Sequence, residues 1–359
     1  MALVADASLT LVPATRPDGL KLVRAWLFLL ATLVVAMVAV GGATRLTGSG
    51  LSITEWKPVT GAIPPLSDLA WAAEFERYRQ IPQYELVNKG MSLSEFKTIY
   101  YWEWAHRQLG RALGLVFFIP LAWFWIRGTI NGRLAATLLA IGALGGLQAG
   151  VGWIMVASGL APGMTAVAPL KLMLHLLVAS AIFALLVRVA AGLGRSGLGR
   201  AGEGTRGAGF LVGLVFVQIA LGGLVAGSKA GLTYNTWPLM DGSLVPAAST
   251  LFVVTPWFEN FVDNVALVQF DHRIVAYAVG AYAVVHASML LHRAPGSAKA
   301  RRASVLAGLV LAQMALGMVT LVLVVPVWAA LAHQVFAMLV LGVAVVHATL
   351  GDSAERAVP

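Results

Sequence analysis

Charge and cysteine are both scarce in this sequence of 359 residues. Only 11% of the residues are Asp, Glu, Lys or Arg, whereas 59% are hydrophobic. So little charge cannot cover the surface of a soluble domain, and the composition therefore indicates a membrane protein. The complete absence of cysteine excludes disulfide scaffolds, iron–sulfur clusters, thiolate-ligated haem and zinc sites built on sulfur.

Eight apolar stretches are long enough to cross the hydrocarbon core as helices, which takes roughly 20 residues each. They cover residues 22–41, 104–126, 134–157, 169–190, 208–228, 268–291, 303–325 and 328–350. The second and sixth begin beside charged or titratable residues, among them Glu103 and His272. Such residues need partners inside a membrane and commonly mark a functional site.

Lys and Arg are distributed unevenly between the connecting segments. If the N-terminus is inside, the inner segments carry most of the basic residues and few acidic ones, which is the positive-inside pattern. The net charge of +9 then reflects topology, and we expect membrane lipid but no nucleic acid as a partner. Both termini are predicted to be cytoplasmic, with residues 42–103 and 229–267 on the outer side.

The second half of the sequence repeats landmarks of the first half in the same order. Matching positions pair Gly41 with Gly222, Trp56 with Trp237, His106-Arg107 with His272-Arg273, Gln148 with Gln313, and His175 with His333. Ordered matches that include Trp, His and Arg indicate an internal duplication.

The expected fold is an all-α integral membrane protein with eight transmembrane helices, arranged as two duplicated four-helix bundles. Because each half has an even number of helices, a pseudo-two-fold axis along the membrane normal should relate them. The predicted parts are an N-terminal tail (1–21), a first bundle (22–190), a linker (191–207), a second bundle (208–350) and a C-terminal tail (351–359).

Four of the seven histidines are related by the repeat: His106 and His175 in the first half, His272 and His333 in the second. In each half they come from the second and fourth helices, which run in the same direction, so both imidazoles lie at similar depth near the outer end. This arrangement suits bis-imidazole ligation of haem iron. A single intramembrane histidine more commonly bonds a neighbouring helix, but two duplicated pairs favour a metal or haem.

Haem fits the histidine pairs better than a bare metal ion does. Each pair of imidazoles lacks a thiolate, and no carboxylate is placed alike in both halves, so the ligand shell for zinc or copper is incomplete. A porphyrin, in contrast, supplies four nitrogens itself. Small residues near the ligand helices either leave room for the macrocycle or allow close helix packing: Gly110, Gly114, Gly145, Gly146, Gly150, Ala276 and Gly280. The remaining histidines, His286, His292 and His347, are interpreted as structural or interfacial.

The repeat places Glu103 opposite Gln269, so a carboxylate precedes His106 by three residues only in the first half. It shares a helix face with the histidine and either accepts a proton or stabilises positive charge on a substrate, or is simply a helix-start residue. The cations Arg107, Arg273 and Lys171 either pair with haem propionates or reach the outer interface. Arg45 lies in an outer segment that we expect to cap the first bundle.

Five segments together resemble the haem A synthase family: GGATRLTGSGLSITEWKPVTGAIPP (41–65), EWAHRQLGR (103–111), LTYNTWPLMDG (232–242), FDHRIVAY (270–277) and AHQ (332–334). The resemblance covers about residues 20 to 350. It implies oxidation of the C8 methyl group of haem O to a formyl group, by two hydroxylations and loss of water, to give haem A for terminal oxidases.

The resemblance also implies roles for individual residues. His106 and His175 match the ligands of the substrate haem O, His272 and His333 match the ligands of a resident haem b, and Glu103 matches the important carboxylate. The chain is similar to the cysteine-free branch with mitochondrial and alphaproteobacterial members, which excludes electron input through thiols. It implies a bacterial inner membrane location, haem sites toward the outer side, delivery of haem O by haem O synthase and an electron acceptor of unknown kind. A homo-oligomer is compatible with the sequence.

Two other classes of protein share some of these features. A dihaem b-type electron-transfer cytochrome would hold two permanent haems, and the Glu103/Gln269 difference argues mildly against it. A haem transporter would place weaker, single-ligand sites along a path through the membrane, whereas the four histidines lie at one depth.

Overall fold

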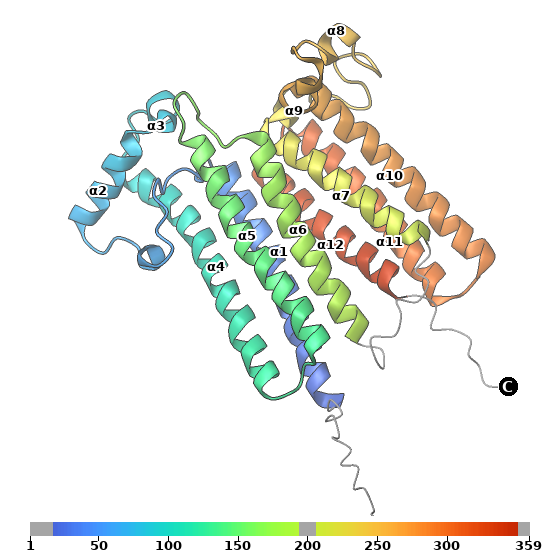
Figure 1. Ribbon diagram of the computed structural model, residues 1–359. Coiled ribbons are helices and arrows are strands. Elements are labelled where there is room, and N and C mark those ends of the chain that lie inside the picture. The colour runs from blue at the N-terminus through green and yellow to red at the C-terminus, as the bar shows by residue number, and fades with distance from the viewer. Residues whose placement is uncertain (1–16, 194–205, 351–359) are drawn as a thin grey trace, which may run out of the picture.

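The computed structural model describes residues 17–193 and 206–350, and these residues form helices and no β-strand (Figure 1). The predicted linker and both predicted tails lie wholly or largely outside the described residues. Eight of the helices in these two described ranges are long and apolar enough to span a membrane. They are α1 (Pro17–Leu46), α4 (Leu93–Ile126), α5 (Gly132–Gly159), α6 (Pro169–Leu193), α7 (Arg206–Gly227), α10 (Val265–Arg293), α11 (Ala298–Val322) and α12 (Val327–Thr349).

The shorter helices lie in the two long connecting segments. They are η1 (Thr60–Ala62), α2 (Asp68–Arg79) and α3 (Pro82–Leu86) between α1 and α4, and η2 (Ala230–Leu232), α8 (Ala248–Leu251), η3 (Trp257–Glu259) and α9 (Asn260–Asp263) between α7 and α10. Figure 1 shows both segments at the same end of the long helices. The start of α1 and the end of α12 lie at the opposite end.

Polar caps set where several long helices begin. The Ser92 hydroxyl accepts a hydrogen bond from the backbone N–H of Glu95, and the Glu95 carboxylate accepts one from the backbone N–H of Ser92. This capping box satisfies N–H groups that would otherwise lack partners at a helix start. Because α4 begins at Leu93, ten residues before Glu103, this carboxylate lies well inside a helix rather than at its first turn.

The membrane helices contact one another in two rings. In the first half, α4 and α6 each contact both α1 and α5, and in the second half α10 and α12 each contact both α7 and α11. Further contacts between α6 and α7, α6 and α12, and α1 and α12 join the halves. Within each ring the second and fourth spanning helices therefore lie across from each other, which is the placement that a shared ligand requires.

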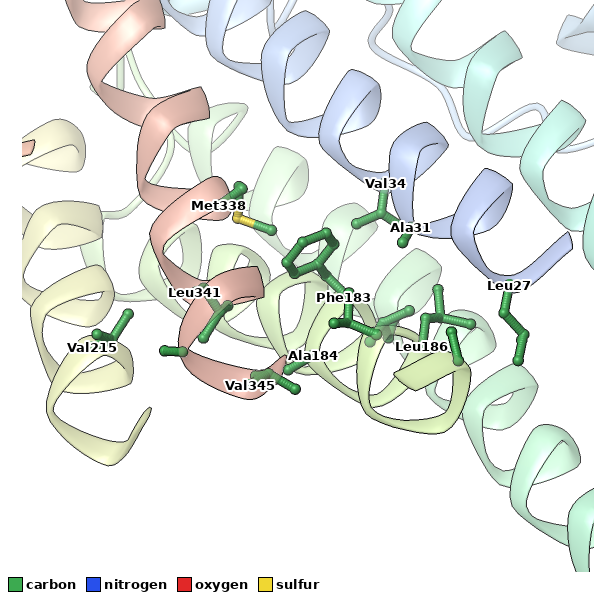
Figure 2. Close-up of a cluster of buried hydrophobic side chains, with 14 of the residues drawn as sticks. Leu27, Ala31, Val34, Phe183, Ala184, Leu186, Val215, Met338, Leu341 and Val345 are labelled. Carbon is green, nitrogen blue, oxygen red and sulfur yellow. The ribbon is translucent and has the colours of Figure 1, made fainter. Parts of the chain in front are cut away.

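One continuous apolar cluster runs through both halves (Figure 2). Leu27 of α1, Leu186 of α6 and Leu341 of α12 are all 1% exposed or less. Gly342 lets α12 approach Phe183 closely, since a Cβ at that position would lie 3.1 Å from the ring. Close packing of this kind holds membrane helices together, because lipid tails are as apolar as the side chains.

Candidate functional site

The four repeat-related histidines project from the helices that face each other across each ring. His106 lies on α4 and His175 on α6, whereas His272 lies on α10 and His333 on α12. All four are half-buried, and each pair is close enough to interact electrostatically. The fold therefore brings together the two pairs that the repeat predicted.

Each histidine ring lies against a glycine of a neighbouring helix. A Cβ built on the glycine would come very close to the ring Cε1 atom: 2.9 Å for Gly41 and His106, 2.8 Å for Gly152 and His175, 3.2 Å for Gly222 and His272, and 2.8 Å for Gly317 and His333. Any larger residue would displace the ring. Four glycines thus hold the four imidazoles in matching positions.

The donor set in each half fits a haem. The Nδ1 atoms of His106, His175 and His333 are buried without a hydrogen-bond partner, although the His175 ring also meets the Gln148 amide at Nε2, 3.3 Å away. Among residues 17–193 and 206–350, no three His, Asp or Glu side chains form a group that could hold a metal ion. Two imidazoles are what a porphyrin iron needs for its axial positions.

The small residues near the histidines fall into two kinds. Gly114 and Gly150 are half-buried with no atom within 4 Å of a built Cβ, which leaves space for a planar group. Gly145 and Gly146 are exposed. Gly280 is different, because a Cβ there would meet the sulfur of Met314 at 2.6 Å, so it allows close helix packing rather than leaving room for a macrocycle.

Glu103 is only 3% exposed, and its carboxylate accepts three hydrogen bonds. The Ser52 hydroxyl and the Ile53 backbone N–H donate to Oε2 at 2.8 and 2.9 Å, and the Arg107 guanidinium donates to Oε1 at 2.7 Å. Arg107 also donates to the backbone carbonyls of Ile53 and Glu55. Glu103 and Arg107 together hold the connecting segment between α1 and α4 against α4.

The second half repeats this arrangement without the charge. Gln269 is 2% exposed; its amide donates to the Ala230 carbonyl at 2.8 Å and accepts from Arg273 at 3.0 Å. Arg273 also donates to the backbone carbonyls of Tyr234 and Leu239. Both arginines are thus engaged with the outer segments.

The other two predicted cations have different surroundings. Arg45, at the end of α1, donates to the Ala226 carbonyl at 2.9 Å, where the end of α7 leaves main-chain acceptors free. Lys171 lies one turn before His175 on α6 and is half-buried. No hydrogen bond or ion pair of its ammonium group occurs within the described part of the chain.

The two repeat-related tryptophans lie at the same end as the histidines. Trp56 stacks on Trp153 of α5 with ring centres 5.5 Å apart, and the Trp237 indole N–H donates to the Tyr277 hydroxyl at 2.9 Å. Both are about half exposed.

A network of charges holds α2 to the part of the connecting segment that contains Glu55 and Lys57. Lys57 pairs with Glu55 at 2.6 Å and with Glu74 at 3.0 Å, while Arg77 pairs with the same two carboxylates. The hydrogen bond from Lys57, and the positive charges of Lys57 and Arg77, hold the pKa of Glu55 below its ordinary value. The ionised network therefore favours the docked position of α2.

A family model described as cytochrome oxidase assembly protein (COX15-CtaA) matches residues 24–345. The chain belongs to this family.

The relatives of this chain include proteins named "Heme A synthase". The proteins from Methylobacterium sp. (strain 4-46), Methylorubrum extorquens (strain PA1) and Brucella anthropi are 65%, 63% and 50% identical to it. The matches cover 93%, 96% and 91% of this chain and 93%, 91% and 91% of the relatives. The matches are thus long enough to span both histidine pairs and both long connecting segments.

Three glutamines that contact the histidine-bearing helices were not identified as site residues from the sequence. Gln148, Gln218 and Gln313 each donate to the main-chain carbonyl of a histidine. The repeat already aligned Gln148 with Gln313, and each glutamine precedes a histidine-facing glycine by four residues. That spacing was a usable signal, but only the packed helices show which histidine each amide meets.

His286 and His347 form a separate pair near the opposite end of the second half. Their Nε2 atoms lie 3.0 Å apart, and both residues are at most 4% exposed. The pair joins α10 to α12, in agreement with the structural role expected for these two histidines.

Proposed function

We propose that this chain is a haem A synthase that oxidises the C8 methyl group of haem O to a formyl group, supplying haem A to terminal oxidases. The observation that carries the proposal is identity of 50–65% over more than nine-tenths of the chain to relatives named for this activity. A dihaem electron-transfer cytochrome has no comparable support.

Two contacts between the halves support a duplicated architecture with a pseudo-two-fold axis along the membrane normal. Arg45 bonds the carbonyl of Ala226, its own repeat equivalent 181 positions later. The Ser180 hydroxyl contacts the sulfur of Met338 at 3.8 Å, again a repeat equivalent, 158 positions later. A two-fold axis between the bundles 22–190 and 208–350 would bring residues close to it into contact with their own equivalents, so these contacts support the proposal.

His106 and His175 hold the substrate haem O in the first half, and His272 and His333 hold a resident haem b in the second. The unpartnered Nδ1 atoms and the glycines behind the rings support both sites. When bound, haem b supplies electron transfer. The first half is assigned to the substrate because its buried carboxylate, Glu103, has a neutral counterpart in Gln269.

Different side chains near the substrate bind it and stabilise its charge. Glu103, kept in place by Ser52, Ile53 and Arg107, presents negative charge one turn from His106 and stabilises positive charge that develops on the substrate. Because Arg107 is engaged by carbonyls of the outer segment, Lys171 is the cation that pairs with a haem propionate.

The location follows from the distribution of charge. We place the protein in the bacterial inner membrane with both termini cytoplasmic and the haem sites toward the outer side. Haem O arrives from the haem O synthase reaction, and an electron acceptor removes the electrons of each oxidation.

Chromatographic identification of the haems extracted from the purified protein tests this function. The protein is made in cells that also make haem O. Haem b together with haem O, haem A or a hydroxylated form is expected. Haem b alone, at two per chain, would contradict the synthase function and favour the electron-transfer cytochrome.

A further inference from the structure

Three of the four histidines share a second feature beyond the glycine behind the ring. A glutamine lies one turn before each of these glycines, in the pairs Gln148/Gly152, Gln218/Gly222 and Gln313/Gly317. The amide Nε2 atoms donate to the main-chain carbonyls of His175, His272 and His333 at 3.0, 3.1 and 2.9 Å. Each glutamine therefore ties a ligand-bearing helix to its neighbour at the level of the ligand.

The glycine that faces His106 is different, because Met37 lies one turn before Gly41. Met37 occupies the repeat position of Gln218. The Met37 Cε atom lies 3.7 Å from a Cβ built on Gly110, one turn after His106. The thioether thus packs on the ligand face of α4 and has no N–H to donate. Across residues 17–193 and 206–350, no side chain donates to the main-chain carbonyl of His106.

This difference has a physical consequence for ligation. A ligand whose helix is already tied to its neighbour loses less freedom when it binds iron, so preorganisation strengthens the bond. Methionine is the most adaptable of the long apolar side chains and adds no hydrogen bond at the level of the ligand. The register of α4 against α1 is held above and below it, where Thr44 Oγ1 donates to the Trp102 carbonyl at 3.3 Å and Trp26 Nε1 donates to the Val116 carbonyl at 2.8 Å. Among the described residues, His106 is the one of the four ligands whose own main-chain carbonyl receives no glutamine hydrogen bond.

We propose that Met37 weakens ligation by His106, so that His106 dissociates from the iron more readily than the other three histidines. Haem therefore exchanges in the first half and stays in the second. Met37 and Gln218 are positioning residues in this view. The inference rests on the proposed function, in which the first half holds a substrate that must enter and leave.

Transfer of haem to an excess of apomyoglobin tests the inference. Full-length protein with both sites loaded is mixed with the acceptor in detergent, release is followed by absorbance, and the haem left on the protein is extracted and identified at each time. The wild type should show a fast phase that removes haem O or its product and a slow phase that removes haem b. The identity of the remaining haem assigns each phase to a half.

The variants exchange the two side chains between the halves. Met37→Gln should slow the fast phase by roughly 2- to 10-fold, the range that one net hydrogen bond produces in an equilibrium. Gln218→Met should accelerate the slow phase by a similar factor. Met37→Leu keeps the volume without adding a donor and should release haem at the wild-type rate.

The outcomes distinguish a failure of this inference from a failure of the proposed function. A fast phase that Met37→Gln leaves unchanged, in protein with wild-type thermal stability, overturns the role of Met37. If that variant does not fold, Gln218→Met decides alone: an accelerated slow phase supports the inference and an unchanged one overturns it. Two haems b leaving the wild type at a single rate would contradict the proposed function itself.

Discussion

Glu103 and Gln269 occupy equivalent buried positions and perform the same structural task. Each holds an outer segment on its helix and pairs with an arginine one turn later. Because Gln269 does this without a charge, the negative charge of Glu103 is not needed to hold the segment. What distinguishes the two halves at this position is therefore the ion pair of Glu103 with Arg107, 2.7 Å long, to which the proposed function assigns the role in catalysis.

Replacing Glu103 by Gln should separate these two tasks. Glu103→Gln is expected to keep haem b bound while formyl formation falls by at least about a hundredfold, the usual cost of losing a preorganised electrostatic contact. Haem extraction with chromatography measures both quantities. Ser52→Ala, which removes one donor but keeps the charge, should lower activity far less. Full activity of Glu103→Gln would remove the catalytic role.

The glycines behind the histidines provide a second residue-scale prediction. Gly317→Ala places a Cβ 2.8 Å from the Cε1 atom of His333, and overpacking of this size costs about 1–3 kcal/mol. Haem b should be lost from the second half while the first half keeps its haem. Gly308→Ala on the same helix, where no atom lies within 4 Å, is the matched control. Equal haem b content in both variants would contradict the tight contact.

At the scale of elements, the membrane helices were predictable and the outer helices were not. Length and apolarity alone indicate a spanning helix, so all eight were found. The helices α2 and α3 were not predicted; their residues were placed only within the connecting segment 42–103. Trp71, Phe75 and Tyr78 recur at helical spacing in α2 and pack on Phe96 and Tyr100 of α4, a signal that was available.

The charge network that holds α2 should make this element sensitive to acid. The pKa of Glu55 is lowered in the folded protein, so its ion pairs stabilise the docked segment above the ordinary carboxyl pKa, and this contribution is lost as the pH falls through the lowered value. Hydrogen exchange of residues 53–80, corrected for intrinsic rates, should rise between pH 7 and pH 4.

Lys57→Met is the control for this acid sensitivity. It removes the cation that bridges Glu55 and Glu74, so the segment should already exchange faster at pH 7 and respond less to acid. The energies are small, under about 1 kcal/mol, because the side chains are partly exposed. Equal protection of the wild type at both pH values would show that aromatic packing alone holds α2.

At the scale of the whole molecule, the halves meet through α1, α6, α7 and α12, and the shared cluster in Figure 2 runs across this interface. The repeat predicted two related halves but not which helices join them. Contacts of Arg45 with Ala226 and of Ser180 with Met338 depend on how the bundles are rotated. Packing of small and apolar side chains decides that rotation.

The proposed orientation leads to a labelling prediction. Because the chain contains no cysteine, a single introduced cysteine is the only thiol. Ser243→Cys, in the exposed second outer segment, should react with a membrane-impermeant maleimide in spheroplasts. Pro295→Cys, in the connection between α10 and α11, should react only after the membrane is opened. The reverse pattern would place the haem sites on the cytoplasmic side.

Composition and spacing by themselves determined the membrane location, the eight spans and the two histidine pairs, because these depend on local runs and on duplication. Only the tertiary structure decided that four glycines face the four histidines and that Glu103 and Arg107 hold the segment between α1 and α4. It also decided that, within the described residues, the main-chain carbonyl of His106 receives no side-chain hydrogen bond, because Met37 has no N–H to donate. These contacts join helices far apart in the chain. The rotation of each helix about its axis creates them, and packing against neighbouring helices sets that rotation.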